Sequence, residues 1–395
     1  MNKHLWLLAA VQGLFLTNNV TFIAINGLVG LSMAPLGWMA TLPVMGYVVG
    51  GALSTGLVAK TQSRWGRKVS FQLGLLVALL SALLAAWAVA SHNFWLLVTA
   101  TVVAGYYSAN GQLYRFAAAE LAQPAFREKA VSLVLAGGLI GAVAGPNLDS
   151  HTRTLTEVPF MGAYLAPAAV ALLAMLVMAG VTFPPQAAKP KLADGKDDHG
   201  RPLGVLMRQP VFVVAAGAAA LSYGVMNLLM AATPLAMQVC GFPFDDAALV
   251  LEWHVIGMFA PGFFTGHLIK RWGVLPIMGV GVALNALCIA IALSGQDLHQ
   301  FLVALFLLGV GWNFLFTGST TLALQAYRPE EKDRAQAAIN FCVFATMAVS
   351  SFASGALVTT QGWMWLNIGS LVPVALTGLG LAWLGWKRQA HPQPR

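Results

Sequence analysis

Residues 184–202 read PPQAAKPKLADGKDDHGRP and divide an otherwise apolar chain into two halves of similar length. Prolines, glycines and lysines in this density cannot bury a hydrophobic core, so the stretch is typical of a solvated linker. The sequence therefore predicts three parts, namely an N-terminal bundle over residues 1–183, a linker over 184–208 and a C-terminal bundle over 209–395.

Both halves consist of long apolar runs. Hydrophobic residues make up 58% of the 395 and charged residues only 9%, and the mean hydropathy is +0.72, outside the range of soluble domains. Each run approaches or exceeds the roughly 20 residues that a helix needs to cross a bilayer. The sequence predicts an all-α integral membrane protein with twelve transmembrane helices in two six-helix bundles. The expected spans are residues 5–28, 36–59, 69–91, 94–120, 130–148, 159–183, 209–238, 247–269, 274–295, 299–324, 336–360 and 363–386.

Lysine and arginine are concentrated in alternate loops of this pattern, and Arg153 is the single basic residue in the loops of the opposite side. By the positive-inside rule the basic side is cytoplasmic, which places both termini in the cytoplasm. The formal charge of +8 is explained by this topology, so we expect a lipid bilayer and no nucleic acid as the partner. No GxxxxGK[ST] loop is present, so we expect no ATP hydrolysis by this chain. We also expect that the protein is not an enzyme.

The two halves also share loop sequences. SRWGRK at 63–68 corresponds to KRWGVL at 270–275, and PAFREKA at 124–130 corresponds to PEEKDRA at 329–335. The two offsets, 207 and 205 residues, are nearly equal. Such a repeat predicts an internal pseudo-twofold axis, with a substrate path near the membrane midplane where the repeats meet.

Few polar residues lie inside the spans, and charged ones there are costly and usually functional. Arg115 either binds an anion or joins a proton relay, or it pairs with Glu120 or extends to the interface. Glu252 lies about a turn and a half inside its span, near headgroup depth. The asparagines of the first span are expected to hydrogen-bond to neighbouring helices.

Spans 7 and 8 each contain a pair of metal-binding residue types at i, i+4 spacing. Met226 and Met230 form an MxxxM pair, and His254 and Met258 form an HxxxM pair, each on one helix face. At about 1.5 Å rise per residue, Met230 and His254 lie at similar depth, as do Met226 and Met258. If the two helices are neighbours, three thioethers and an imidazole meet in one pocket.

This donor set suits copper, because thioether sulfur is a soft, neutral ligand and imidazole accepts either copper oxidation state. Met237 and Cys240 lie toward the outer end of span 7 and are candidate residues for metal entry. The alternative is that the methionines pack in helix interfaces, which is their commoner role. A membrane-bound copper chaperone or sensor would keep the pocket but would not need two repeats.

The loop after span 2 resembles the signature G-x-L-x-D-R-x-G-R-K of the major facilitator superfamily of secondary transporters. It keeps Arg64 and Arg67, but Ser63 occupies the acidic position. The second copy keeps Arg271 and has Lys270 at that position. The resemblance implies the two-bundle fold of that family and a gating role for these arginines. Because both acids are missing, we expect the gating contacts to be made differently, with Arg115 and Glu252 as further candidates.

The motifs in spans 7 and 8, with 28 residues from Met226 to His254, resemble the CcoA-like copper transporters (CalT branch) of that superfamily. The resemblance implies a bacterial inner-membrane carrier that imports copper for haem–copper oxidase assembly by alternating access. Copper would be the substrate rather than a cofactor, and a cytoplasmic copper acceptor would receive it. The same group resembles riboflavin transporters, so import of riboflavin or another small organic solute is the alternative, with Trp312, Phe314 and Phe316 as stacking candidates.

Overall fold

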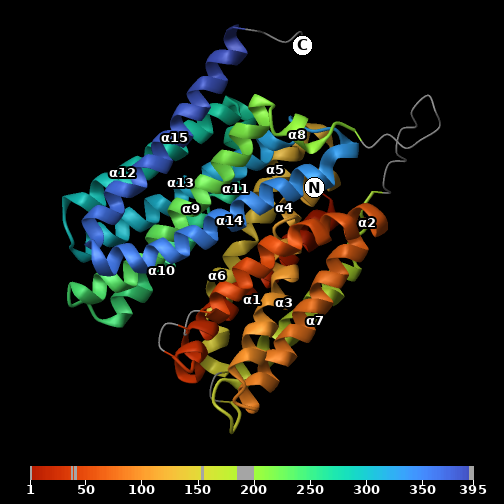
Figure 1. Cartoon of the computed structure of the whole chain (residues 1–395). Helices are drawn as coiled ribbons and strands as arrows, with labels where there is room; N and C mark the ends of the chain where they lie inside the picture. The colour runs from red at the N-terminus through yellow and green to blue at the C-terminus, as the bar shows by residue number, and fades with distance from the viewer. Residues whose placement is uncertain (1, 37–38, 40–41, 153–154, 185–199, 391–395) are drawn as a thin grey trace. The chain divides into compact units, whose positions relative to one another are not determined.

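The computed structural model describes residues 2–36, 39, 42–152, 155–184 and 200–390. Those residues form helices, turns and short coil, with no strand among them (Figure 1). Most of the expected linker, with Lys189, Lys191 and Lys196, lies outside the described residues, and so does Arg153. The elements are α1 (Lys3–Met33), α2 (Leu42–Ala90), α3 (Phe94–Gly111), α4 (Tyr114–Leu121), η2 (Pro124–Phe126), α5 (Arg127–Ala136), α6 (Gly138–Thr152), α7 (Met161–Ala179), α8 (Leu203–Leu206), α9 (Pro210–Val239), α10 (Phe244–Phe259), α11 (Gly262–Trp272), α12 (Val274–Ser294), α13 (Leu298–Ala323), η3 (Pro329–Glu331), α14 (Lys332–Thr360) and α15 (Gly362–Ala390).

The helices account for the twelve expected spans. Among the described residues, nine helices are long and apolar enough to cross a membrane, and the bent pair of α10 and α11 adds a tenth. The 49-residue α2 covers spans 2 and 3, while α3 and α4 together cover span 4. The all-α fold class is confirmed.

Several spans that the hydropathy pattern predicts as single helices are interrupted. The pair α10 and α11 bends by 41° at residues 260–261. Pro261 lacks a backbone N–H and its ring crowds the preceding turn, which explains the bend. Span 5 breaks at Gly137, where a side chain would collide with the Ala9 carbonyl oxygen of α1. The break therefore allows two helix backbones to approach closely.

The described chain divides into two compact units. The first contains Met1–Ala188 together with Gln336–Phe344, and the second contains Lys189–Ala335 together with Ala345–Arg395. In the first unit α2 packs against α3 and α7, and α1 packs against α6 and α7 (Figure 1). In the second unit α13 packs against α9, α10 and α12. Each unit encloses its own hydrophobic core.

The repeated loops have matching backbone structure. Gly66 has φ 79° and ψ 173°, and Gly273, 207 residues later, has φ 87° and ψ 162°. This region strongly favours glycine, so the RWG sequence fixes the same turn twice. Arg64 lies 5.7 Å from the ring centre of Trp65, and Arg271 lies 5.2 Å from that of Trp272. The second pair of loops forms η2 and η3, and each begins with proline.

Candidate functional site

His254 has a partner on a helix outside the predicted pair of spans 7 and 8. The imidazole is fully buried, and its Nδ1 lies 2.7 Å from the Leu305 carbonyl oxygen of α13. Because a carbonyl only accepts, Nδ1 carries the proton and donates it. A side chain at Gly309 of α13 would collide with the His254 carbonyl, so α10 lies directly against α13. The hydrogen bond of this ring therefore connects α10 to α13.

The methionines of the MxxxM and HxxxM pairs differ in burial. Met226 and Met258 are buried and Met230 is half-buried. The Met258 carbonyl accepts a hydrogen bond of 2.6 Å from Asn313 Nδ2, which ties α10 to α13 a second time. Among the described residues, no group of three or more His, Cys, Asp or Glu side chains is arranged to hold a metal ion.

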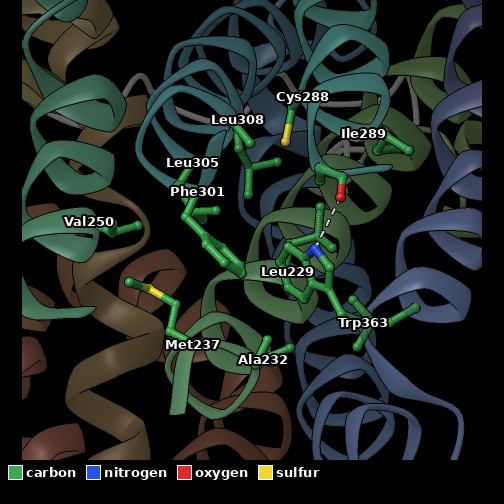
Figure 2. Packing of buried hydrophobic residues seen from close by; sticks show 14 of the residues in the cluster. Leu229, Ala232, Met237, Val250, Cys288, Ile289, Phe301, Leu305, Leu308 and Trp363 are labelled. Carbon is green, nitrogen blue, oxygen red and sulfur yellow. Dashed lines mark hydrogen bonds between the residues drawn. The ribbon is translucent and has the colours of Figure 1, made fainter. Parts of the chain in front are cut away.

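The candidate entry residues also differ in environment. Met237 is fully buried in the core of the second unit, a cluster that includes Leu229 and Val250 (Figure 2). In the same cluster the Trp363 indole N–H donates to the Ala292 carbonyl at 3.2 Å (Figure 2). Cys240 is exposed, and its Sγ lies 3.3 Å from Gln296 Oε1. Met237 thus packs as an ordinary core residue.

Arg67, in the loop after span 2, pairs with an acidic residue from another helix. Its Nη2 forms an ion pair of 2.6 Å with Glu120 Oε1 of α4, and its Nε donates to Oε2 at 3.2 Å. Nη2 also donates to Gln336 Oε1 at 2.7 Å, and Nη1 contacts Gln62. All of these residues belong to the first unit. Arg67 thus binds a carboxylate from a different helix, and its expected role in gating stays a prediction.

The other charged candidates fall into two groups. Arg115 is 2% exposed, so the interpretation in which it extends to the membrane interface is wrong. Its guanidinium donates to the Gln112 carbonyl and to Asn340 Oδ1, and it lies 4.7 Å from the ring centre of Phe116. By contrast, the side chains of Arg64, Arg271 and Glu252 are exposed.

A hollow in the first unit is lined by residues outside the predicted site. It is narrow, with room for about one water molecule. Aromatic rings form one wall, since the ring centres of Phe22 and Tyr47 lie 5.6 Å apart. The lining residues are Asn18, Phe22, Tyr47, Ala78, Ser81, Ala82, Ala104, Tyr107 and Pro167. None of these lining residues carries a charge.

The polar side chains of the hollow come from the middle of α1, from α2 and from α3. Asn18 lies midway along α1, and its Nδ2 donates to the Pro167 carbonyl of α7 at 3.1 Å. Its Oδ1 is buried without a hydrogen-bond partner. The Tyr107 hydroxyl is buried within reach of the Asn18 side chain. The i, i+4, i+8 spacing of Asn18, Phe22 and Asn26 was the sequence signal for this face.

The second unit has an aromatic cluster of its own. The rings of Trp312 and Phe316 stack with centres 4.8 Å apart and an angle of 19° between their planes. Tyr223 and Phe259 meet the Trp312 ring edge to face at 5.5 and 5.9 Å. The Trp312 indole N–H is buried without an acceptor among the described residues. Phe314 lies apart from this cluster, against Gly281 of α12.

Two helical units with repeated loops and long apolar spans are typical of a multi-pass membrane transporter. The chain belongs to the Major Facilitator Superfamily, whose sequence profile matches residues 5–260 and 216–395. That family is one of transporters rather than of enzymes. The expectation of this superfamily from the loop signature is therefore confirmed.

Two relatives match nearly the whole chain. The riboflavin transporter RfnT of Brucella anthropi is 37% identical over 366 residues, which cover 92% of this chain and 91% of RfnT. The uncharacterized MFS-type transporter YdeG of Bacillus subtilis is 24% identical over 367 residues, covering 90% and 85%.

Solved structures share the fold at low identity. FucP in the outward conformation has a TM-score of 0.79 at 15% identity, with 96% of this chain and 98% of FucP covered. A bacterial homologue of the iron transporter ferroportin has a TM-score of 0.76 at 14% identity, with coverages of 97% and 99%. At this identity the match describes the fold and not the substrate.

The similarity to RfnT overturns the copper-import interpretation. That interpretation depended on the MxxxM and HxxxM pairs and on their resemblance to the CcoA-like branch, and the comparisons do not support that branch. His254 contributes to the contact between α10 and α13 in this structure. Membership of the superfamily remains, and copper import is wrong.

Proposed function

We propose that this protein is a secondary transporter of riboflavin or of a planar heteroaromatic compound of similar size. The observation that carries the proposal is the 37% identity to the riboflavin transporter RfnT over nine-tenths of both chains. Two repeats with matching loops are suited to alternating access, in which substrate enters from one side and leaves on the other. No bound cofactor is needed for this transport.

The interiors of both units support a flat, uncharged substrate. In the first unit, aromatic rings and the amide of Asn18 line a narrow hollow without any charged residue. In the second unit, Trp312 and Phe316 are stacked beside Tyr223. Aromatic side chains bind planar rings by stacking, and a few polar atoms fix their orientation.

We also propose that the protein lies in a bacterial inner membrane with both termini in the cytoplasm. The basic residues on one side of the membrane support this orientation through the positive-inside rule. They include Lys60, Arg64 and Lys68 in the first repeat and Lys270 and Arg271 in the second. The bilayer is then the permanent partner of the apolar outer surface.

The test is uptake of radiolabelled riboflavin into a riboflavin auxotroph that lacks a flavin carrier of its own. Cells that express the chain should accumulate label and grow on low external riboflavin, and cells with the empty vector should not. Trp312→Leu should reduce uptake, because it removes a stacked ring and a buried N–H group. Trp383→Leu is the matched control, because Trp383 is exposed and should leave uptake unchanged. Equal uptake with and without the chain would refute the proposal.

A further inference from the structure

The two RWG loops carry the same pair of exposed side chains. Arg64 and Trp65 are exposed in the first loop, and Arg271 and Trp272 are exposed in the second. Each guanidinium lies over the ring of the tryptophan that follows it, at 5.7 and 5.2 Å from the ring centre. Tryptophan is enriched at the depth of lipid headgroups, where its ring contacts the apolar layer and its N–H contacts water. Both loops therefore have the side chains of a boundary between bilayer and water.

The helix before each loop changes from apolar to basic along one face. Leu57 is exposed seven residues before Arg64, and Phe264 is exposed seven residues before Arg271. Seven residues are about two helical turns, so each apolar side chain shares a face with its arginine, about 10 Å away along the axis. An exposed apolar residue of a membrane-spanning helix contacts acyl chains. Each face thus offers an apolar surface and a cation at a spacing that one amphiphilic molecule can cover.

The protein does not neutralise the cations on these faces. Neither Arg64 nor Arg271 forms an ion pair or a side-chain hydrogen bond with another residue in the described part of the chain. No Asp or Glu occurs within ten residues of either arginine in the sequence. A second side chain of basic type, Lys60 or His267, is exposed one turn before each arginine on the same face. Basic groups that have no acidic partner and lie at a membrane surface attract anionic headgroups.

We propose that each RWG loop binds the headgroup of an anionic phospholipid. The guanidinium of Arg64 or Arg271 binds the phosphate, because its forked N–H donors match two phosphate oxygens. The acyl chains lie along the apolar face that precedes the arginine. The two sites are repeats of each other, one in each unit, and they do not depend on which substrate the protein transports.

The surroundings of the arginines favour a lipid over a free anion. An exposed arginine binds free phosphate weakly, because water and salt screen the attraction. A lipid adds apolar contact with the face that carries Leu57 or Phe264, and the bilayer keeps it at high local concentration. A zwitterionic headgroup has the same phosphate, but its ammonium group offsets the attraction. The sites should therefore prefer a headgroup with net negative charge.

The first test changes the lipid and leaves the protein intact. Delipidated full-length chain in neutral detergent is titrated with phosphatidylglycerol or with phosphatidylcholine, and native mass spectrometry counts the bound molecules. The first two phosphatidylglycerol molecules should bind at least roughly fivefold more tightly than phosphatidylcholine, which is the factor expected for one cation at an anionic surface. Equal affinity for the two lipids would overturn the proposal.

A competition experiment separates a lipid site from a simple anion site. Inorganic phosphate is added to the chain that holds two phosphatidylglycerol molecules, at the same ionic strength as a chloride control. The lipids should stay bound, because phosphate cannot replace their apolar contacts. Release of both lipids by phosphate at a concentration similar to that of the lipid would show adventitious anion binding and would refute the lipid assignment.

The second test changes single groups on the protein. Arg64→Ala and Arg271→Ala should each remove one of the two tight sites, and the double variant should bind phosphatidylglycerol no better than phosphatidylcholine. Arg127→Ala is the matched control, because Arg127 is exposed and loses the same charge, but it has no neighbouring tryptophan and Glu128 follows it. This control should keep both sites. Two tight sites in the double variant, or an equal loss in Arg127→Ala, would contradict the proposal.

Misfolding of the variants can be separated from loss of the sites. Arg64 and Arg271 are exposed, so the apparent Tm of each variant in lipid-free detergent should equal that of the native chain. Addition of phosphatidylglycerol should raise the Tm of the native chain and should not raise that of the double variant. An equal rise in both proteins would overturn the assignment, and the comparison of lipids on the native chain needs no variant at all.

Discussion

Arg67 and Glu120 form an ion pair of 2.6 Å that joins the loop after the second span to the end of α4. The loop lacks the acidic residue typical of its signature, because Ser63 occupies that position. The carboxylate comes from a residue 53 positions later in the chain. Gln336 of α14 binds the same guanidinium at 2.7 Å, so Arg67 connects three segments of the first unit.

Removal of Arg67 should destabilise the protein and impair transport. Arg67→Ala leaves the partly buried Glu120 without its ion pair, a change that costs on the order of 3 kcal/mol. The exposed Arg64 in the same loop is the matched control, and Arg64→Ala should change stability by less than about 0.5 kcal/mol. Apparent Tm of the purified variants and uptake in cells measure both effects, and equal behaviour of the two would contradict this account.

Arg67→Lys should restore little of the lost stability. The guanidinium binds Glu120 through two nitrogens and reaches Gln336 as well, whereas an ammonium group is a single point of charge. A double-mutant cycle of Arg67→Ala with Glu120→Gln measures the coupling directly. We expect a coupling energy of about 1–3 kcal/mol, and additive effects would show that the pair does not interact.

Gly66 should tolerate alanine poorly even though nothing occupies the space around it. A methyl group at position 66 would meet no neighbouring segment within 4 Å, so the expected cost of about 1–3 kcal/mol comes from the backbone conformation alone. Gly56 in the helical part of α2 also has open space, and Gly56→Ala should be neutral or stabilising. Apparent Tm values of the two variants provide the comparison. A Gly66→Ala protein as stable as Gly56→Ala would refute this explanation of the repeated RWG turn.

Arg201, near the C-terminal end of the expected linker, should anchor this segment by binding Glu331. Its backbone N–H, Nε and Nη2 all donate to the fully buried Glu331 carboxylate, at 2.6–2.7 Å. These hydrogen bonds raise the pKa of the Arg201 guanidinium, so it remains charged throughout the accessible pH range. Arg201→Ala should destabilise the protein by about 2 kcal/mol, less than a fully buried pair because Arg201 is partly exposed.

The control for Arg201 is the exposed Arg208 in the same segment. Arg208→Ala should leave both stability and the rate of proteolysis before α8 unchanged, while Arg201→Ala should raise that rate. Glu331→Gln keeps the shape but loses the charge, and its effect should be intermediate. If Arg208→Ala and Arg201→Ala were cleaved at the same rate, the contact would not anchor the linker.

Riboflavin transport should not depend on metal ions. His254 Nδ1 donates to the Leu305 carbonyl, so His254→Leu should lower stability by about 1 kcal/mol. Uptake of riboflavin by the native chain should be the same in the presence of a copper chelator. Strong inhibition by the chelator, reversed by added copper, would contradict the structural role of His254.

Composition, hydropathy and loop spacing were sufficient to predict the fold class. Twelve apolar runs, basic residues in alternate loops and two RWG loops 207 residues apart are local or periodic properties that require no knowledge of contacts. The signature around Arg64 and Arg67 predicted the superfamily for the same reason. The interruptions at Gly137 and Pro261 were harder to place, because a glycine or proline in a span does not by itself show how the helix bends.

The candidate site could not be predicted in the same way. Helical spacing correctly places Met226 and Met230 on one face and His254 and Met258 on another, but it does not say which helix each face meets. In the structure His254 forms its hydrogen bond with α13, and Met237 is buried in an apolar core. A depth match between two helices is therefore necessary for a shared pocket, but it is not sufficient.

The sequence by itself determined that this chain crosses a membrane many times in two related halves, because hydropathy and charge are properties of each residue. Only the tertiary structure decided which polar groups meet, since Asn18, Tyr107 and Pro167 come from three helices and Arg67 and Glu120 from two. Such contacts depend on how helices rotate and pack about their axes. That rotation is set by packing between segments far apart in the chain.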